Sequence, residues 1–344
     1  MSPRVAQVMA GAEVGGAETF YVTLNLALKR AGFDQKLIIR HNPRRLALLR
    51  EGGCEATELT FGNWLDLATP WRLRALFKEY RPDIVVTWLN RAAAVCPKGP
   101  YLRVARLGGY YKMKHYRGFD HVIGIVPGIV KYLLDAGWPA DRVHYLPNFC
   151  RVDQVPPVDR ALHDTPADAP LLLVLARLHD DKGLDVLLDS LAELPGVYLW
   201  IAGEGPLLGD LEGQAARLGI AERVRFLGWR NDRSALFGAA DICVFPSRVE
   251  PHGTVTMEAW AHGVPLVAAD SSGPKEMIRP DVDGVLVPMN DADALATGIK
   301  RVMGAPDFAA KLVAEGGARA EREFSEAAVV ARYLEFFDDV NRRR

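Results

Sequence analysis

The chain has 344 residues, 49% hydrophobic and 25% charged, an ordinary globular composition on a chain too long for one typical core. Its four cysteines lack the CxxC spacing of a zinc site and the pattern of a disulfide framework: Cys54, Cys96, Cys150 and Cys243. No run approaches the roughly 18 apolar residues of a membrane-spanning helix, and the N-terminus lacks a signal-peptide pattern. We therefore expect a cytoplasmic protein, at most peripheral at the inner face of a membrane.

The net charge of −1 conceals an uneven distribution. Residues 1–160 carry 23 Lys+Arg against 14 Asp+Glu, a net charge of +9, whereas the remaining residues carry −10. A basic first half suits contact with a polyanion or an anionic membrane surface. Chance, together with mutual attraction of the two halves, explains the asymmetry equally well.

Strand-like runs alternate with helical patterns through the first half. Residues 19–30, closed by Gly32, predict a helix. Short apolar runs predict strands at 5–9, 36–39, 84–88, 122–126 and 143–146. Several of these runs are continuously apolar, which is typical of parallel strands covered on both faces.

The second half repeats this scheme after a proline-rich polar stretch at 156–170, which predicts a linker. Strands are predicted at 171–176, 198–202, 224–227, 242–245, 265–268 and 285–287. Helices are predicted at 184–194, 208–218, 234–240, 254–262 and 327–340.

The alternation predicts an α/β protein with two facing Rossmann-like, doubly wound domains. We expect the first domain at 1–155, with the C-terminal helix 327–344 packing back on it, and the second at 171–326. Ligands of such sheets bind at the carboxyl ends of the strands, so we expect the site in a cleft between the domains.

Each half opens with a candidate phosphate-binding element. Gly15 and Gly16 follow the first strand and precede a helix, where backbone N–H groups can approach a phosphate. In the second half, Arg177 and Lys182 lie between a strand end and a helix start. Two fixed cations converging there can neutralise a diphosphate leaving group without a metal. A tight turn and two solvated charges are the ordinary alternatives.

The next loop, at 203–209, misses the dinucleotide GxGxxG spacing by one residue and indicates a tight turn near a nucleotide. The following strand ends in Gly228-Trp229-Arg230, a candidate platform for the base in which we expect Arg230 to bind the donor. An exposed loop is an equal alternative for Trp229 and Arg230.

The segment 247–259 is the most informative of the chain. It leaves an apolar strand, passes Glu250, Pro251, His252 and Gly253, and begins a helix at Thr254. The first N–H groups of that helix suit an anion such as phosphate. Glu250 and Glu258 would repel phosphate, so binding of sugar hydroxyls is the natural role for both carboxylates.

These motifs together resemble the retaining, nucleotide-sugar-dependent glycosyltransferases of glycosyl transferase group 1, or family 4. The resemblance covers nearly the whole chain, and the ordered set is specific although each motif is common. The matching elements are Gly15-Gly16-Ala17-Glu18, Leu146-Pro147-Asn148, Ala176-Arg177-Leu178 with Lys182-Gly183, the residues 202–206, Phe226-Leu227-Gly228, Phe245-Pro246-Ser247, Glu250 with Glu258, the residues 261–265, Ser272-Gly273 with Glu276, and Gly284.

The resemblance implies a GT-B fold and a role for each matching residue. Arg177 and Lys182 would bind the donor diphosphate, and with Glu250, which faces the donor sugar, they form the implied catalytic set. Glu258 would bind the ribose hydroxyls. The backbone of Gly253, Thr254 and Val255 would hold phosphate and sugar oxygens, and no cofactor or metal is expected. Glu276 would instead have a structural role at the start of a helix.

One departure concerns the histidine that such enzymes carry in the first domain. The corresponding stretch reads Arg106-Leu107-Gly108-Gly109-Tyr110-Tyr111 and has no histidine. A front-side displacement needs less from such a residue, because the departing phosphate oxygen can take the acceptor proton.

The acceptor is expected to contact a stretch that mixes aromatic rings and cations: Tyr110, Tyr111, Lys112 and Lys114. Rings stack on sugars, and cations bind phosphate, carboxylate or an anionic membrane surface. This favours a lipid-linked or phosphorylated glycan acceptor, such as lipopolysaccharide core or another envelope glycan. A solvated loop is the alternative.

Two other functions stay open. A nucleotide-sugar epimerase would share this architecture, although the first half offers few acid/base carboxylates. A non-catalytic protein that binds sugar nucleotides would explain the missing histidine. Nucleic-acid binding is disfavoured, since the basic residues form no recognised module.

Overall fold

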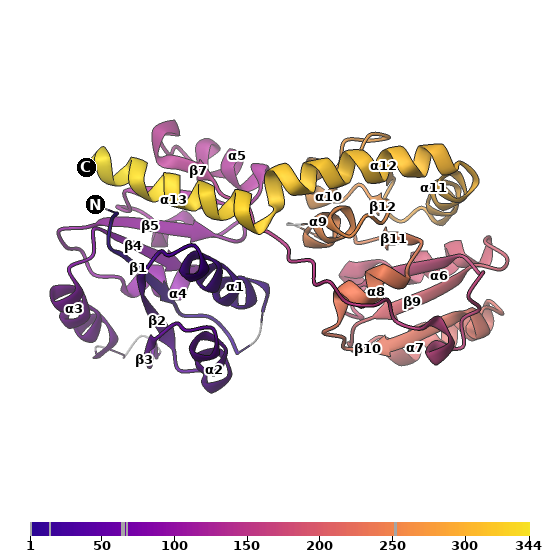
Figure 1. The fold of residues 1–344 in the computed structure, drawn as a ribbon, viewed down its shortest axis with the longest axis horizontal. Helices are drawn as coiled ribbons and strands as arrows, with labels where there is room; N and C mark the ends of the chain where they lie inside the picture. The colour runs from indigo at the N-terminus through magenta and orange to yellow at the C-terminus, as the bar shows by residue number, and fades with distance from the viewer. Residues whose placement is uncertain (1, 14, 63–65, 67, 251–252) are drawn as a thin grey trace. The chain divides into compact units, whose positions relative to one another are not determined.

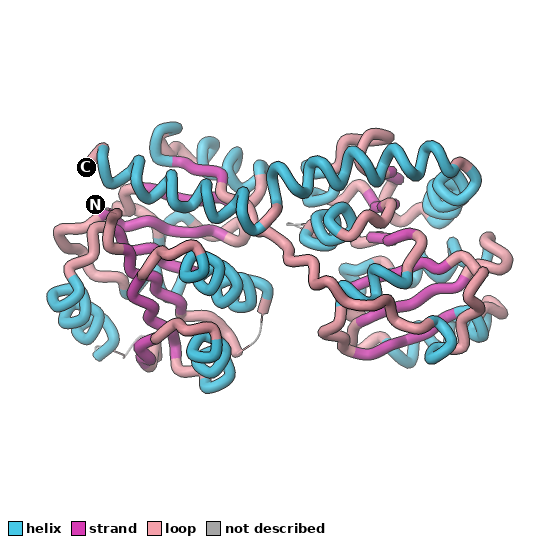
Figure 2. Tube along the Cα trace, in the orientation of Figure 1, coloured by secondary structure: helices cyan, strands magenta, loops and turns pink. Residues whose placement is uncertain are grey.

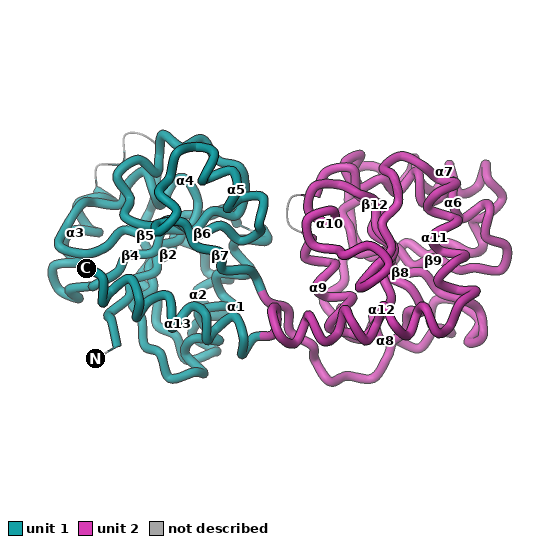
Figure 3. The backbone as a smooth tube through the Cα atoms, turned by 90° about the horizontal axis from the view of Figure 1, so that it is seen from above, with its two compact units in different colours: residues 1–148, 326–344 teal, residues 149–325 magenta. Residues whose placement is uncertain are grey.

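The computed structural model describes residues 2–13, 15–62, 66, 68–250 and 253–344. The chain divides into two compact units, the first built from residues 1–148 and 326–344 and the second from 149–325 (Figure 3). Each unit is a parallel sheet with helices packed around it (Figure 2). The predicted α/β class with two Rossmann-like units is therefore confirmed.

The first unit holds a seven-stranded sheet in the order β3-β2-β1-β4-β5-β6-β7 (Figure 1). Its strands are β1 (Val5–Met9), β2 (Gln35–Arg40), β3 (Ala56–Leu59), β4 (Ile84–Trp88), β5 (Leu102–Leu107), β6 (His121–Gly124) and β7 (Val143–Tyr145). Its helices are α1 (Gly16–Arg30), α2 (Pro43–Glu51), α3 (Ala68–Tyr80), α4 (Leu89–Val95), α5 (Pro127–Asp135) and α13 (Glu326–Arg342).

The centre of this sheet shows why continuous apolar runs predict it. Every residue of β1 and β4 is buried, and the two strands pair in parallel with Met9 opposite Trp88. Gln7 is the polar exception in β1, and its side-chain oxygen accepts a hydrogen bond from the Trp88 indole at 2.8 Å. A buried polar pair satisfied in this way costs little and fixes the register.

The second unit holds a six-stranded sheet in the order β10-β9-β8-β11-β12-β13. Its strands are β8 (Leu171–Leu175), β9 (Tyr198–Ala202), β10 (Val224–Gly228), β11 (Ile242–Phe245), β12 (Leu266–Ala269) and β13 (Val285–Val287). Its helices are α6 (Leu184–Ala192), α7 (Leu208–Arg217), α8 (Arg233–Ala239), α9 (Thr254–Ala261), α10 (Ser272–Met277), α11 (Ala292–Gly304) and α12 (Pro306–Arg319).

The last helix, α13, belongs to the first unit although α12 belongs to the second. Phe337 is fully buried and stacks on Phe33 with ring centroids 5.6 Å apart. The Tyr333 hydroxyl accepts a hydrogen bond from Arg106 of β5 at 2.9 Å. Because Arg106 is itself buried, this helix completes the core of the first unit.

The proline-rich stretch 156–170, expected to be a linker, lies within the second unit and makes hydrogen bonds to its helix α8 and to the residues that follow it. The Val158 amide donates to the Ala235 carbonyl oxygen, and Arg160 donates to Ala239 and pairs with Asp241. The sequence patterns did not individually predict strands β3 and β5 or helices α2, α3, α4, α5, α11 and α12. Glu276, expected at the start of a helix, is instead the fifth of the six residues of α10.

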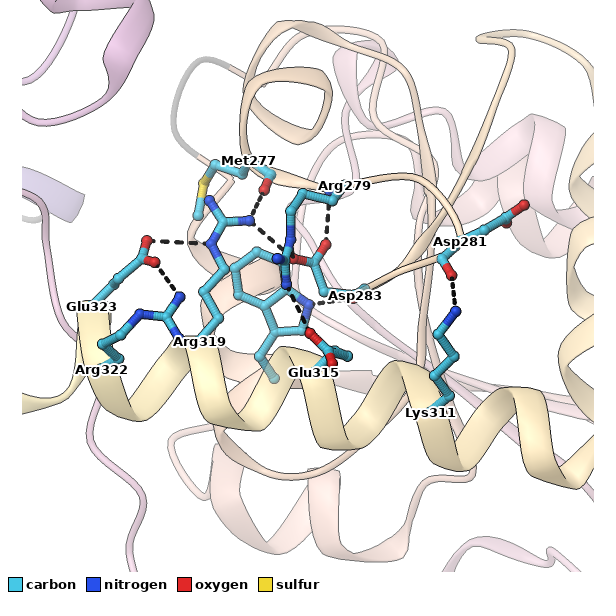
Figure 4. Close-up of polar contacts among 10 residues, drawn as sticks. Met277, Arg279, Asp281, Asp283, Lys311, Glu315, Arg319, Arg322 and Glu323 are labelled. Atoms are coloured by element: carbon cyan, nitrogen blue, oxygen red, sulfur yellow. Dashed lines mark hydrogen bonds and ion pairs between the residues drawn. The ribbon is translucent and has the colours of Figure 1, made fainter.

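Figure 4 shows the Asp283 carboxylate paired with Arg279 and Arg319. The Asp283 carboxylate has no exposed surface and accepts from Arg279 at 2.7 Å and from Arg319 at 3.0 Å. The Asp283 carbonyl oxygen accepts from the indole of Trp260, a residue of α9, at 2.5 Å. One acidic residue thus connects α9 to α12.

No helix among the described residues is long and apolar enough to cross a bilayer.

Candidate functional site

The candidate site lies in the second unit, at the carboxyl ends of four neighbouring strands. Strands β10, β9, β8 and β11 are parallel, so the loops that follow them open at one edge of the sheet. Glycines allow these loops to touch. A Cβ on Gly203 would lie 1.8 Å from the Ala176 carbonyl oxygen, and one on Gly183 would lie 2.3 Å from that of Pro246. Neither position tolerates a side chain.

Lys182 and Glu250 meet at this edge. The Lys182 Nζ lies 3.0 Å from Oε2 of Glu250 and 3.3 Å from the Val249 carbonyl oxygen. Both side chains are largely buried. The two residues come from different loops, and Gly183, with a left-handed φ of 62°, lets the chain turn directly after Lys182.

Arg177 and Lys182 converge on one oxygen. Oδ2 of Asp181 lies 3.6 Å from Nη2 of Arg177 and 3.5 Å from Nζ of Lys182. The Arg177 side chain is 65% exposed, so one of the two cations is open to solvent. Asp181 was not predicted from the sequence, and no spacing signal marks it.

Arg248 links the segment that follows β11 to the segment that follows β8. Its guanidinium makes two hydrogen bonds to the Asp185 carboxylate, at 2.8 and 2.6 Å, and a third to the Asp180 carbonyl oxygen. The pairing holds the pKa of Asp185 below its ordinary value, against the opposing effect of burial. Arg248 is therefore committed to structure rather than to a ligand.

Helix α9 begins at Thr254 directly after Gly253, whose φ is 61°. No side chain among the described residues caps this helix start, which leaves its first N–H groups without a side-chain partner. The Glu250 carbonyl oxygen accepts from the Gly273 amide at 2.7 Å, which ties the loop to α10. The predicted loop positions Pro251 and His252 lie outside the described residues.

Glu258 lies one turn inside α9 and is 8% exposed. Burial raises the pKa of Glu258 to about 7, although its ion pair with Arg233 acts in the opposite direction. Arg233 lies at the start of α8 and was not predicted. The site thus contains a carboxyl group that titrates near neutral pH beside a half-exposed arginine.

The β9 and β10 loops meet through Glu204, whose Oε1 accepts from the Trp229 amide at 3.2 Å. Trp229 is 58% exposed. Arg230 makes two hydrogen bonds to Asp232, at 2.8 and 2.5 Å. Arg233, not Arg230, therefore reaches Glu258.

The glycine loop of the first unit is built around a carboxylate. A Cβ on Gly11 or on Gly15 would lie 2.3 Å from an oxygen of Glu18. The Ala12 amide donates to Glu18 Oε1 at 2.7 Å. Glu18 thus fills the space that the Gly15 turn leaves, whereas a Cβ on Gly16 would meet no atom within 4 Å among the described residues.

The predicted acceptor residues lie on the loop after β5. Tyr110 packs edge-on against Tyr132, and the Tyr132 hydroxyl donates to the Tyr111 carbonyl oxygen at 2.9 Å. Burial raises the pKa of the Tyr111 hydroxyl. Lys112 and Lys114 lie on the same loop, at or near the surface. Among the described residues, no cluster of three or more His, Cys, Asp or Glu side chains is arranged to hold a metal ion.

Two Rossmann-like units, each built on a parallel sheet, are the architecture of the GT-B fold class. Residues 157–319 match the family model "Glycosyl transferases group 1", and residues 14–154 match "Glycosyltransferase Family 4". The chain belongs to this family, as the sequence motifs predicted, and is a glycosyltransferase.

Individual relatives extend the match to nearly the full chain. The lipopolysaccharide core biosynthesis glycosyltransferase LpsE of Rhizobium meliloti (strain 1021) is 35% identical over 93% of this chain and 95% of its own. LpsD of the same strain is 32% identical over 97% of this chain and 98% of its own. The structure of Anabaena Alr3699/HepE in complex with UDP-glucose has a TM-score of 0.82 at 21% identity, covering 98% of this chain and 100% of its own.

Proposed function

We propose that this glycosyltransferase moves a sugar from a nucleoside-diphosphate sugar to a glycan or lipid-linked acceptor, with retention of anomeric configuration and without a metal ion. The observation that carries the proposal is the convergence of Arg177 and Lys182 on a single carboxylate oxygen of Asp181, beside Glu250. A donor diphosphate would replace that contact. The complex of Alr3699/HepE with UDP-glucose supports the choice of donor class.

In the proposed reaction the bond between the anomeric carbon and the diphosphate oxygen breaks while the acceptor oxygen bonds to the same face of that carbon. The acceptor proton passes to the departing phosphate oxygen. Arg177, Lys182 and the N–H groups at the start of α9 (Thr254 and Val255, after Gly253) stabilise the charge that develops on the diphosphate. Glu250 accepts hydrogen bonds from donor-sugar hydroxyls.

Glu258 is proposed to bind the ribose hydroxyls. Arg230, Gly15 and Gly16 stay predicted donor contacts. Arg230 would have to leave Asp232 to make its contact, because the two are joined by paired hydrogen bonds. Arg233 is a further candidate, since it already holds the Glu258 carboxylate at the same strand edge.

The acceptor is proposed to be lipopolysaccharide core or another envelope glycan. The relatives LpsE and LpsD are named for lipopolysaccharide core biosynthesis. Tyr110, Tyr111, Lys112 and Lys114 offer aromatic faces and positive charge of the kind that binds such a glycan.

We place the enzyme in the cytoplasm, in peripheral contact with the anionic inner face of a membrane. Helix α3 supports this contact, because Trp71 is 69% exposed and its neighbours Arg72, Arg74 and Lys78 are exposed cations. An exposed indole beside basic side chains suits the interface of an anionic bilayer. Co-sedimentation with phosphatidylglycerol vesicles should fall in Trp71→Ala, and binding equal to that of wild type would contradict the assignment.

The first test is a thermal-shift screen with UDP-, GDP- and ADP-sugars, because a bound donor raises the melting temperature by mass action. The preferred donor is then incubated with a truncated lipopolysaccharide core, with and without EDTA. We expect transfer in both samples and a product whose anomeric configuration, read by proton NMR, matches the donor. Inversion or a requirement for magnesium would contradict the mechanism, and an epimerised donor formed without acceptor would indicate an epimerase.

A further inference from the structure

The first unit contains a hollow of about 330 Å³ whose lining includes none of the proposed donor contacts. It lies at the carboxyl ends of β1 and β4, where the strand order of the sheet reverses. Its lining includes the charged and polar side chains Glu18, Arg40, Asn90, Arg91 and Tyr111. A volume at the small end of ligand pockets suits one sugar residue rather than a lipid chain.

The two arginines of the hollow lack a carboxylate partner within the part of the chain that the structure describes. Neither Arg40 nor Arg91 has an acidic side chain there within ion-pair distance. Arg40 donates to the Gly11 carbonyl oxygen at 3.5 Å, and Arg91 donates to the Phe61 carbonyl oxygen at 3.4 Å. Guanidinium groups that face a hollow without a counter-ion favour an anionic ligand.

A third arginine, Arg45, adds positive charge next to the hollow, because it contacts the backbone of a lining residue. Arg45 is 4% exposed, donates to the Ala12 carbonyl oxygen at 2.7 Å, and has a buried Nη1 with no partner among the described residues. Glu18 is the opposing charge, and one of its oxygens already accepts from the Ala12 amide. The two lining arginines and Arg45 carry three positive charges against the single negative charge of Glu18, so the net charge around the hollow is positive.

The remaining lining suits a carbohydrate. The Tyr116 hydroxyl donates to the Asn90 side-chain oxygen, which leaves the Asn90 amide N–H groups as donors. Tyr111 supplies an aromatic ring, and Glu18 supplies a carboxylate that can accept from sugar hydroxyls. Leu89, which also lines the hollow, holds a φ of 69°, a strained value for a leucine at the strand end.

We propose that this hollow binds an anionic sugar residue of the acceptor, bearing a phosphate or a carboxylate. Arg40 and Arg91 bind the anionic group, and Glu18 and Asn90 bind the hydroxyls. This inference rests on the proposed function, because it names the acceptor class for the same transfer. It differs from the donor assignment in that none of the residues lining the hollow is a proposed donor contact.

The test measures binding of small probes by ligand-detected NMR: mannose 6-phosphate, glucuronic acid and neutral mannose. The variants are Arg40→Gln and Arg91→Gln. The matched control is Arg142→Gln, an exposed arginine just before β7 in the same unit but outside the hollow. We expect wild type to bind a charged probe at least about 10-fold more tightly than mannose, and each hollow variant to lose about 10- to 100-fold of that affinity.

The outcomes separate the hollow from the donor site. Equal affinity for charged and neutral probes, or the same loss in Arg142→Gln, would overturn the proposal. The thermal shift produced by UDP-glucose should be unchanged in both hollow variants. Its loss would assign the hollow to the donor diphosphate and also overturn the proposal. Retained binding of the charged probes in an enzyme that fails to transfer sugar would refute the proposed function and leave the anion site standing.

Discussion

At the scale of single residues, the donor site depends on charges that the fold holds close together. Lys182 joins Glu250 and Asp181 in a largely buried cluster, and Arg177 extends the cluster toward solvent. Removing a partner of a buried ion pair leaves the other charge uncompensated. Substitutions here should therefore affect both catalysis and stability, and controls must separate the two effects.

Lys182→Ala should lower kcat/KM by about 10²- to 10³-fold, because it removes a preorganised cation from the developing diphosphate charge. The control is Lys300→Ala, an exposed lysine on α11 of the same unit. Steady-state kinetics with the preferred donor measure the effect. Near-wild-type kinetics in Lys182→Ala would remove the lysine from the proposed chemistry.

Glu258→Gln should change how stability depends on pH. A carboxyl group with a folded-state pKa raised from 4.5 to about 7 contributes stability that is present at low pH and lost as pH rises toward 7. The variant stays neutral and avoids that loss, which is on the order of 3 kcal/mol with the opposing effect of Arg233 already included. Its melting temperature relative to wild type should thus be higher at pH 8 than at pH 5. A difference that is constant across this range would contradict the raised pKa.

At the scale of elements, α9 is held by a carboxylate that touches no solvent. Asp283 accepts from Arg279 and Arg319, and its backbone accepts from Trp260 of α9 (Figure 4). Gly316 of α12 permits this close packing, since a Cβ there would lie 2.4 Å from the Trp260 ring. The position of the α9 N-terminus therefore depends on residues outside the candidate donor site.

Asp283→Asn should destabilise the second unit by about 3 kcal/mol, because the largely buried Arg319 and the half-exposed Arg279 lose the buried carboxylate that pairs with both. Asp281→Asn is the matched control, as Asp281 is half-exposed and its pair with Arg301 lies at the surface. We expect a change below about 1 kcal/mol in the control. Chemical denaturation measures both, and equal effects would contradict the role of the buried network.

At the scale of the whole molecule, the C-terminal residues 326–344 belong to the first unit, although residues 149–325 form the second. Helix α13 contributes Val329, Tyr333 and Phe337 to a core that is otherwise built from residues 1–148. Tyr333 and Arg106 are 227 residues apart in sequence. Both ends of the chain are thus needed to complete one unit.

Phe337→Ala should cost about 3 to 5 kcal/mol, because a fully buried ring that stacks on Phe33 leaves a cavity. The loss should appear as faster hydrogen exchange in β5 and α1, both elements of the first unit. Glu335→Ala, an exposed position on the same helix, should leave exchange unchanged. Exchange that rises only in the second unit would contradict the assignment of α13.

Local patterns explain which elements were predictable. Strands β1, β4, β8 and β11 are apolar runs that the parallel sheets cover on both faces, so composition alone indicates them. Strand β5 was missed because its sequence, LRVARL, contains two arginines. Arg106 is tolerated there since it lies over the Trp88 ring and donates to Asn148 and Tyr333.

The sequence by itself determined the α/β class, the family and the loops at the strand ends, because apolar runs and glycine or proline positions are local signals. Only the tertiary structure decided which charges meet. Lys182 and Glu250 are 68 residues apart, and Glu258 and Arg233 are 25 apart, so no spacing rule pairs them. The glycine loop shows the same limit, because Glu18 folds back into the space that Gly15 leaves. The partner of a charged side chain depends on which loops, distant in sequence, the sheet brings to the same edge. A local sequence pattern does not contain that information.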